Sequence, residues 1–228
     1  MKRHCRLGAL AVLLCLPAAD ASPQTQQDTY LSWPVEQAET VGRSMRADGR
    51  AGGRFDMRIL KTDRAYNYKL RATWLTPEVI RASARIEQLR SRLSDAQTRA
   101  LVAEAEAAGQ TVILVEIDPR EGSGVIPLDW RAVLQAKDWK PGMPGSVLGV
   151  STPQLKLVKA LAGVVRRDYS YDVFWVVFPL LDDTGAPVFA DAIRDVELVV
   201  GIHEKEGAVS WPVPASIRQR ALALSQKK

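Results

Sequence analysis

The sequence has 228 residues, a formal net charge of +5, two cysteines and two histidines. This length supplies an ordinary hydrophobic core, and the few sulfur and imidazole groups leave little material for zinc or thiol chemistry. The charge excess falls to +3 without residues 1–21, which hold Lys2, Arg3, Arg6 and Asp20, so the composition does not support nucleic-acid binding.

Residues 1–21 have the pattern of a secretory signal peptide. A basic start precedes the apolar run Leu7–Leu16, which is too short to span a bilayer, and Ala19-Asp20-Ala21 matches a small-x-small cleavage site. We therefore expect cleavage after Ala21 and export to the periplasm or the extracellular space, with no transmembrane segment in the mature chain. Lipid attachment at Cys15 is disfavoured because leucines, rather than a small residue, precede it.

Cleavage changes the chemical inventory of the chain. Cys5, Cys15 and His4 would leave with the signal peptide, so the mature chain would have no cysteine and a single histidine, His203. We expect a flexible polar leader over residues 22–28 and a single domain over 29–228, held together without disulfides.

The first part of the mature chain alternates between helix and strand signals. Apolar residues at helical spacing predict a short helix over 35–45, and the glycines of 47–53 indicate a loop. Alternating polar and apolar residues predict strands over 54–61 and 65–75, joined as a hairpin.

A helical hairpin is predicted over about 77–108. Thr76 is a helix cap before Pro77, and the apolar spacing that follows is helical. Ser94 and Gln97 match a capping box that begins a second helix, which Gly109 ends.

The middle of the chain contains one clear strand. The apolar run of 111–118 predicts a strand buried on both faces. Residues 125–136 fit a strand, with a helix opened by Asp129 as the alternative, and the Pro/Gly-rich segment 137–146 indicates an irregular, mobile loop. Thr152-Pro153 indicates a short helix that ends at Gly163.

The last part of the chain supplies the centre of the predicted fold. Residues 169–180 read as a core strand, and 196–205 and 208–213 as a hairpin turning at Glu206-Gly207. Residues 216–225 predict an amphipathic helix with Arg218 and Arg220 on its outer side. Because short connections join strand to strand, we predict an α+β fold: an antiparallel, β-rich, sandwich-like core with the helical hairpin packed on it.

Candidate catalytic residues are few. Asp118, Glu121 and Asp129 lie around one turn-rich loop, where two carboxylates could perform acid-base hydrolysis of a glycan, and His203 is the only candidate imidazole base. Solvated turn residues explain the same pattern. No metal-binding, cofactor-binding or phosphate-loop motif is present, and we expect no cofactor.

Two further features could bind a ligand. Trp130 and Trp139 border the Pro/Gly-rich loop, which also contains Met143, and exposed aromatic residues there could stack on sugars or anchor a protein. A basic run could contact a polyanion, although acidic residues interrupt it. The run consists of Arg43, Arg46, Arg50, Arg54 and Arg58.

The sequence favours an exported, non-enzymatic module that binds a protein or a glycan of the cell envelope. One alternative is a carboxylate-dependent hydrolase that uses Asp118, Glu121 or Asp129. Another is a component of an envelope assembly, for which we expect an exposed apolar patch, with the last helix as its candidate location.

Overall fold

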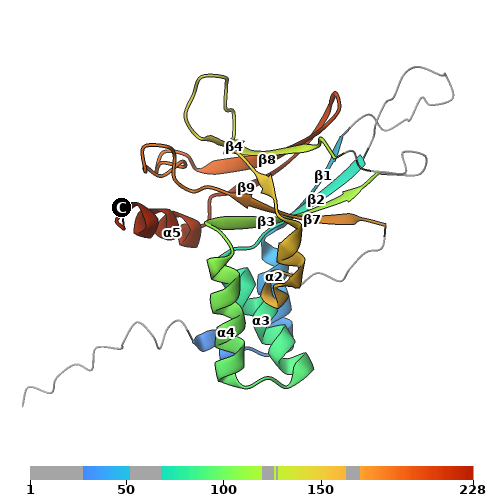
Figure 1. Cartoon of the computed structure of the whole chain (residues 1–228), viewed down its shortest axis with the longest axis vertical. Coiled ribbons are helices and arrows are strands. Elements are labelled where there is room, and N and C mark those ends of the chain that lie inside the picture. The colour runs from blue at the N-terminus through green and yellow to red at the C-terminus, as the bar shows by residue number, and fades with distance from the viewer. Residues whose placement is uncertain (1–27, 52–67, 120–125, 127, 163–169, 228) are drawn as a thin grey trace, which may run out of the picture.

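The computed structural model describes residues 28–51, 68–119, 126, 128–162 and 170–227. These residues form two antiparallel sheets and a set of helices, packed together as an α+β fold with a β-rich core (Figure 1). The predicted fold class is confirmed. The predicted signal peptide, the Arg54–Lys61 strand and the leader up to residue 27 lie outside the described residues; Asp28, the last leader residue, pairs with Arg99 at 3.0 Å. No described helix has the length and apolarity to cross a membrane.

Nine strands are described, and every pairing between them is antiparallel. Sheet A has the order β1-β2-β3-β7-β6, and sheet B has the order β5-β4-β8-β9. The strands of sheet A are Arg46–Ala51 (β1), Tyr68–Trp74 (β2), Thr111–Asp118 (β3), Asp172–Phe178 (β7) and Val150–Ser151 (β6). The strands of sheet B are Ser146–Leu148 (β5), Arg131–Ala136 (β4), Asp195–Ile202 (β8) and Lys205–Pro212 (β9).

Strand β3 separates two hydrophobic clusters. Ile113 and Val115 face the space between the sheets, where they share a cluster with Leu198 of β8. Val112 and Leu114 point the other way, into a cluster formed with the helices. The prediction that this strand is buried on both faces is therefore confirmed, and its unbroken apolar sequence is what allows both layers to form.

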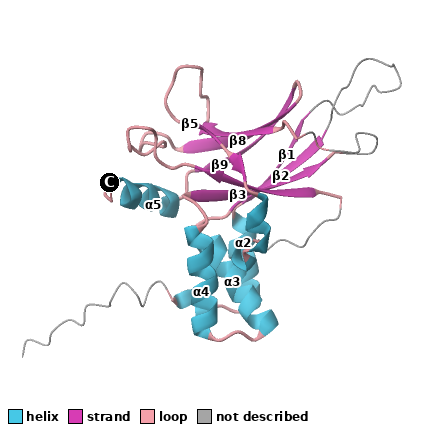
Figure 2. Cartoon of the chain, viewed as in Figure 1, coloured by secondary structure: helices cyan, strands magenta, loops and turns pink. Residues whose placement is uncertain are grey.

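The helices form a layer on the side of sheet A away from sheet B (Figure 2). They are α2 (Val35–Ser44), α3 (Pro77–Ser91) and α4 (Asp95–Ala107), with short 3₁₀ turns η1 (Thr29–Ser32), η3 (Pro153–Leu157) and η4 (Lys159–Leu161) beside them. The predicted helical hairpin is confirmed in detail: Thr76 accepts a hydrogen bond from Val79 N, and Ser94 and Gln97 form the capping box. Arg92 turns the chain between α3 and α4 in the left-handed region, with φ of 53°. The segment after Thr152 forms η3 and η4 instead of an α-helix.

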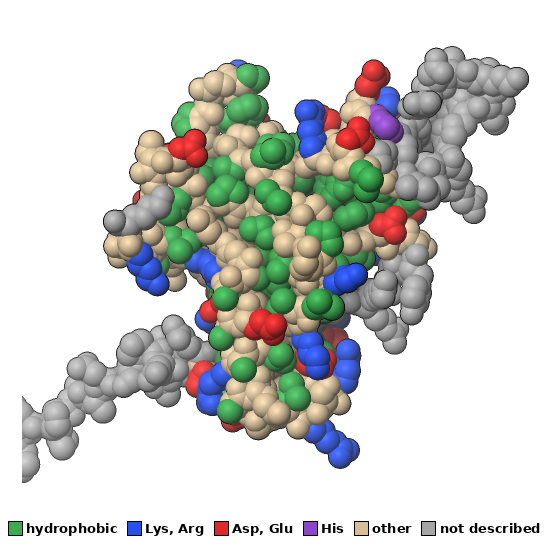
Figure 3. Space-filling model, viewed as in Figure 1, with side chains coloured by type: hydrophobic (Ala, Val, Ile, Leu, Met, Phe, Trp, Pro, Cys, Tyr) green, Lys and Arg blue, Asp and Glu red, His purple; other side chains and the backbone are tan. Residues whose placement is uncertain are grey.

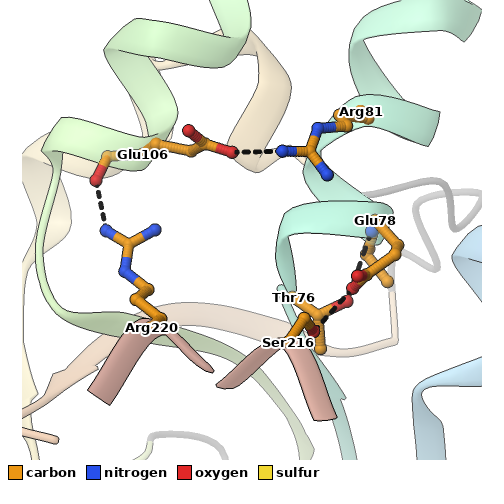
Figure 4. A network of polar contacts seen from close by, with 7 residues as sticks. Thr76, Glu78, Arg81, Glu106, Ser216 and Arg220 are labelled. Carbon is orange, nitrogen blue, oxygen red and sulfur yellow. Dashed lines mark hydrogen bonds and ion pairs between the residues drawn. The ribbon is translucent and has the colours of Figure 1, made fainter. Parts of the chain in front are cut away.

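The last helix, α5 (Ala215–Ser225), is fastened to both helices of the hairpin (Figure 4). Ser216 donates to the carboxylate of Glu78, 2.8 Å away, and Arg220 donates to the backbone carbonyls of Glu106 and Gly109. The prediction that Arg218 and Arg220 lie on the outer side was wrong. Arg218 donates to the carbonyls of Ala190 and Ile193, so both guanidinium groups point at backbone carbonyls of neighbouring segments rather than at solvent.

The glycine-containing segment predicted as a loop is a strand. Residues 46–51 form β1, which pairs with β2. A Cβ atom on Gly49 would lie 2.6 Å from the carbonyl oxygen of Ala208 in β9. Glycine is present there because the edges of the two sheets approach closely, and not because the chain turns.

The predicted hairpin of β8 and β9 is confirmed, but its turn lies earlier. Ile202 pairs with Lys205, so His203 and Glu204 make the turn, and Glu206-Gly207 lies inside β9. His203 has a positive φ of 52°. A Cβ atom on Gly207 would approach the ring of Tyr68 to 3.2 Å, so this glycine also marks a close approach.

Candidate binding surface

The predicted catalytic residues lie at the ends of strands. Asp118 ends β3 and forms an ion pair with Lys69, whose Nζ lies 3.1 Å from its carboxylate. Asp129 is exposed in a turn before β4, and His203 is exposed at the β8–β9 turn. Glu121 lies outside the described residues. In the described part of the chain, no group of three or more His, Cys, Asp or Glu residues is placed to hold a metal ion.

The outer face of sheet B carries an apolar row that crosses all four strands. Leu148 of β5 pairs with Val133 of β4, Val133 pairs with Val199 of β8, and Val199 pairs with Ala208 of β9. Paired residues project to the same face, so these four side chains form a line across the sheet. The core-facing residues of β4 and β8 are their neighbours in sequence, Ala132, Leu134, Leu198 and Val200. The row therefore belongs to the face opposite the core, and its outermost member, Leu148, is 63% exposed.

Polar side chains border the apolar row on both sides. On one side Gln135 donates to Glu197, 2.9 Å away, with Ser146 and Ser210 in the same cross-strand line. On the other side Arg131 pairs with Glu206 at 2.7 Å, reaching across Gly201. A Cβ atom on Gly201 would lie 2.9 Å from Arg131 Nε, so the glycine makes room for this ion pair.

Trp139 stands at one end of this surface, and hydrogen bonds hold it there. Its Nε1 donates to the carbonyl of Met143 at 2.7 Å, and Gly142, with φ of 90°, turns the chain between them. A 2.7 Å bond from Ala136 N to Gly145 O closes the loop. The segment predicted as irregular is thus a loop with its own hydrogen bonds.

The indole of Trp139 borders two hollows. One, of about 580 Å³, lies over the outer face of sheet B and is lined by Val133, Gln135, Glu197, Val199 and Ala208 among others. The other, of about 400 Å³, lies on the loop side and includes Met143 and Ile193. Of the three predicted binding residues, Trp139 and Met143 therefore lie together at a concave surface.

Trp130 has a different environment. It is half-buried, and its ring centroid lies 4.8 Å from that of Phe174 in β7, against the core between the sheets. The structure places it in packing contact with sheet A rather than beside Trp139.

Exposed aliphatic residues continue beyond Leu148. Val150 of β6 is 63% exposed and Leu157 of η3 is 76% exposed. In the space-filling view, hydrophobic side chains gather across the middle of the visible face (Figure 3). Val150 and Leu157 lie in the segment that follows β5, where the chain passes from sheet B to sheet A.

Comparisons with known proteins give no functional assignment. No family model and no curated protein matches the sequence. A solved structure described as a novel protein of unknown function from Burkholderia pseudomallei is similar, with a TM-score of 0.40 and 12% identity, covering 84% of this chain and 88% of that one.

Sequence reasoning found Trp139 and Met143 but missed the apolar row. The outward positions of β4 and β8 alternate with core positions in the sequence, and this alternation is visible without a structure. The alignment of Leu148, Val133, Val199 and Ala208 depends on strand register, which the sequence does not specify.

Proposed function

We propose that this protein is an exported, non-enzymatic binding module that holds a partner protein of the cell envelope on the outer face of sheet B. The observation that carries the proposal is the uncovered apolar row of Leu148, Val133, Val199 and Ala208 beside the fixed indole of Trp139. The signal-peptide pattern of residues 1–21 supports export.

The chemistry of the surface resembles the centre of a protein interface. An antiparallel sheet with one face on the core ordinarily presents polar side chains on the other face. Here aliphatic residues occupy the middle and hydrogen-bonding pairs occupy the rim, which is the arrangement of an interface with an apolar core and a polar border. The surface pairs Gln135–Glu197 and Arg131–Glu206 contribute little to stability, and a partner can use their remaining hydrogen-bonding capacity.

A protein ligand fits this surface better than a glycan. Sugar rings stack on aromatic faces, and Trp139 is the only aromatic residue among the described residues that line the hollow over sheet B. Valine, leucine and alanine supply the rest of the apolar contact on this face. Burial of aliphatic side chains, worth about 25 cal/mol per Å² of apolar area, is a usual source of protein–protein affinity.

The test is affinity capture of the mature protein from an envelope extract of its source. Leu148→Arg and Ala208→Arg place a charge in the row at exposed positions, so both variants should fold and both should lose the captured partner. Leu222→Arg is the matched control, because Leu222 is 48% exposed and lies on α5, outside the apolar row.

Three results would be informative. Loss of one partner from both row variants but not from the control supports the proposal. Retention of every partner by the row variants contradicts it. Binding to an oligosaccharide array that Trp139→Ala abolishes would instead identify a glycan ligand.

A further inference from the structure

The outer face of sheet A carries a second surface, with opposite chemistry. Arg46, Asp48 and Arg50 alternate along β1 and project to one face. Their partners in β2 are Thr73, Arg71 and Lys69 respectively, so the side chains of Arg71 and Lys69 join the same face. Four cationic side chains thus come together from two strands.

These residues line a hollow of about 330 Å³. Its walls are Arg46, Asp48, Gly49, Arg50, Lys69, Leu70, Arg71 and Tyr171. The guanidinium carbon of Arg71 lies 4.0 Å from the centroid of the Tyr171 ring, a cation–π contact that fixes the orientation of both groups. The hollow is at the small end of the range for ligand sites, which suits a small group rather than an extended chain.

Carboxylates neutralise only part of this charge. Asp48 pairs with Arg46 at 3.2 Å and with Arg71 at 3.3 Å, and Asp118 pairs with Lys69. Within the described residues, no ion pair engages Arg50. Among the residues that the structure describes here, the four cations exceed the carboxylates by one when Glu116, the buried cross-strand neighbour of Arg71, is counted with Asp48 and Asp118.

A buried donor here also lacks an acceptor. The Nε atom of Arg46 is buried, and no acceptor in the described part of the chain meets it. A buried N–H group without a hydrogen bond destabilises the fold. Arg46 lines the hollow, so a small rotation of its guanidinium group toward a bound oxyanion would satisfy this donor. The hollow therefore combines an excess of positive charge with an unused buried donor.

We propose that this hollow binds the oxyanion group, a carboxylate or a phosphate, of a small ligand. Arg46 and Arg50 supply the hydrogen bonds, because the planar guanidinium group matches both oxyanions in two-point contacts. Asp48 holds Arg46 and Arg71 in place and competes with the ligand for them. Tyr171 supplies a flat wall beside the anion.

This site accounts for part of the basic run in the sequence. Arg46 and Arg50 contribute to the hollow, whereas Arg43 lies on α2 and pairs with Glu39. Arg54 and Arg58 lie outside the described residues. The arrangement favours one small anion over a polyanion spread along the run.

The test is calorimetric titration of the mature protein with inorganic phosphate and, separately, with citrate and acetate, at low ionic strength. Binding of phosphate alone identifies the ligand group as a phosphate, and binding of citrate or acetate identifies it as a carboxylate. Either result supports the proposal. Arg50→Ala should weaken binding about tenfold, as expected for the loss of one charge-assisted hydrogen bond. Asp48→Asn should tighten binding, since it removes the competing carboxylate.

Arg43→Ala is the matched control, since it removes one arginine from the exposed part of the same run. It should bind the anion as the wild type does. If the wild type binds none of the three anions, the proposal is overturned. An equal loss of anion affinity in Arg43→Ala and Arg50→Ala also overturns it. Dichroism of each variant checks folding. The result is independent of partner capture by sheet B, because these substitutions lie on sheet A and α2.

Discussion

Replacing Arg220 tests whether a single buried cation fastens α5 to the helical hairpin. Its guanidinium donates to the carbonyl of Glu106 and, at 2.8 Å, to that of Gly109. Glu106 lies in the last turn of α4, which has no basic residue of its own. The carbonyls at that helix end have no partner within the helix, so Arg220 satisfies them and places positive charge at the negative end of the helix dipole.

The magnitude follows from these contacts. Burial lowers the pKa of Arg220 and the nearby Glu106 carboxylate opposes this shift, but arginine keeps its charge at every ordinary pH. Hydrogen bonds from a charged donor contribute about 1.5–3 kcal/mol. Arg220→Met preserves the length of the side chain and removes the donors, so we expect the free energy of unfolding to fall by about 2 kcal/mol. In a chain of this size, that corresponds to a drop in Tm of roughly 4–8 °C.

Urea denaturation followed by far-ultraviolet dichroism measures the effect. Gln219→Met is the control, because Gln219 is exposed on the same helix and carries the same substitution. The free energy of unfolding of Arg220→Lys should lie between those of the two methionine variants, since lysine keeps the charge but lacks the planar guanidinium group. If the free energy of unfolding of Arg220→Met lies within about 0.5 kcal/mol of that of the control, the reasoning from hydrogen bonds is refuted. In that case the apolar contacts of Ile217 and Ala221 hold α5 in place.

Two further predictions concern a close approach and a turn. Gly49→Val places a Cβ atom where Ala208 O would be 2.6 Å away, so the free energy of unfolding should fall by about 1–3 kcal/mol in the same urea assay; an unchanged midpoint would mean that the sheet edges can separate at no cost. The carboxylate of Asp182 accepts hydrogen bonds from Thr184 Oγ1 and from the backbone N–H groups of Thr184 and Ala186, which hold the pKa of Asp182 below its ordinary value. Because the folded pKa is the lower one, the stabilisation is complete above the unfolded pKa of about 3.9 and is lost as the pH falls through the folded pKa. Carbon-detected NMR titration should find the pKa of Asp182 below the ordinary aspartate value of about 3.9, and a pKa at or above that value would contradict the turn geometry.

Local signals predicted the helical hairpin correctly. Thr76 and Ser94 cap their helices through hydrogen bonds to residues three positions later, so the information lies within one turn of sequence. Strand β3 was predictable for a similar reason, since an apolar run of that length needs cover on both faces wherever it lies.

Glycines were misread because their role here is set by neighbours distant in sequence. Gly49 and Gly207 both lie inside strands, at points where another strand or the Tyr68 ring leaves no room for a side chain. Sequence reasoning assigned one to a loop and the other to a turn. The true turn uses His203 at positive φ, a conformation that is uncommon for a residue other than glycine, although histidine adopts it more often than most.

The candidate surfaces were only partly predictable. Trp139 and Met143 were found because both lie in one short loop, whose Pro/Gly content marks it in the sequence. The apolar row of sheet B and the basic hollow of sheet A each combine residues from separate strands. A register shift of one residue would turn these side chains to the opposite face of the sheet, and neither surface would form. Sequence patterns identify the outward positions of a strand, but only the pairing shows which outward positions meet.

The two surfaces can be separated because the sandwich keeps them apart. The apolar row lies on the outer face of sheet B and the basic hollow on the outer face of sheet A, with the core cluster between the sheets. A charge placed at Leu148 leaves the core and the hollow intact, and Arg50→Ala leaves the row intact. If the same substitution weakens both partner capture by sheet B and anion binding by sheet A, the cause is a loss of stability of the sandwich and not of a binding contact. If each affects one activity alone, the fold carries two independent sites of different chemistry.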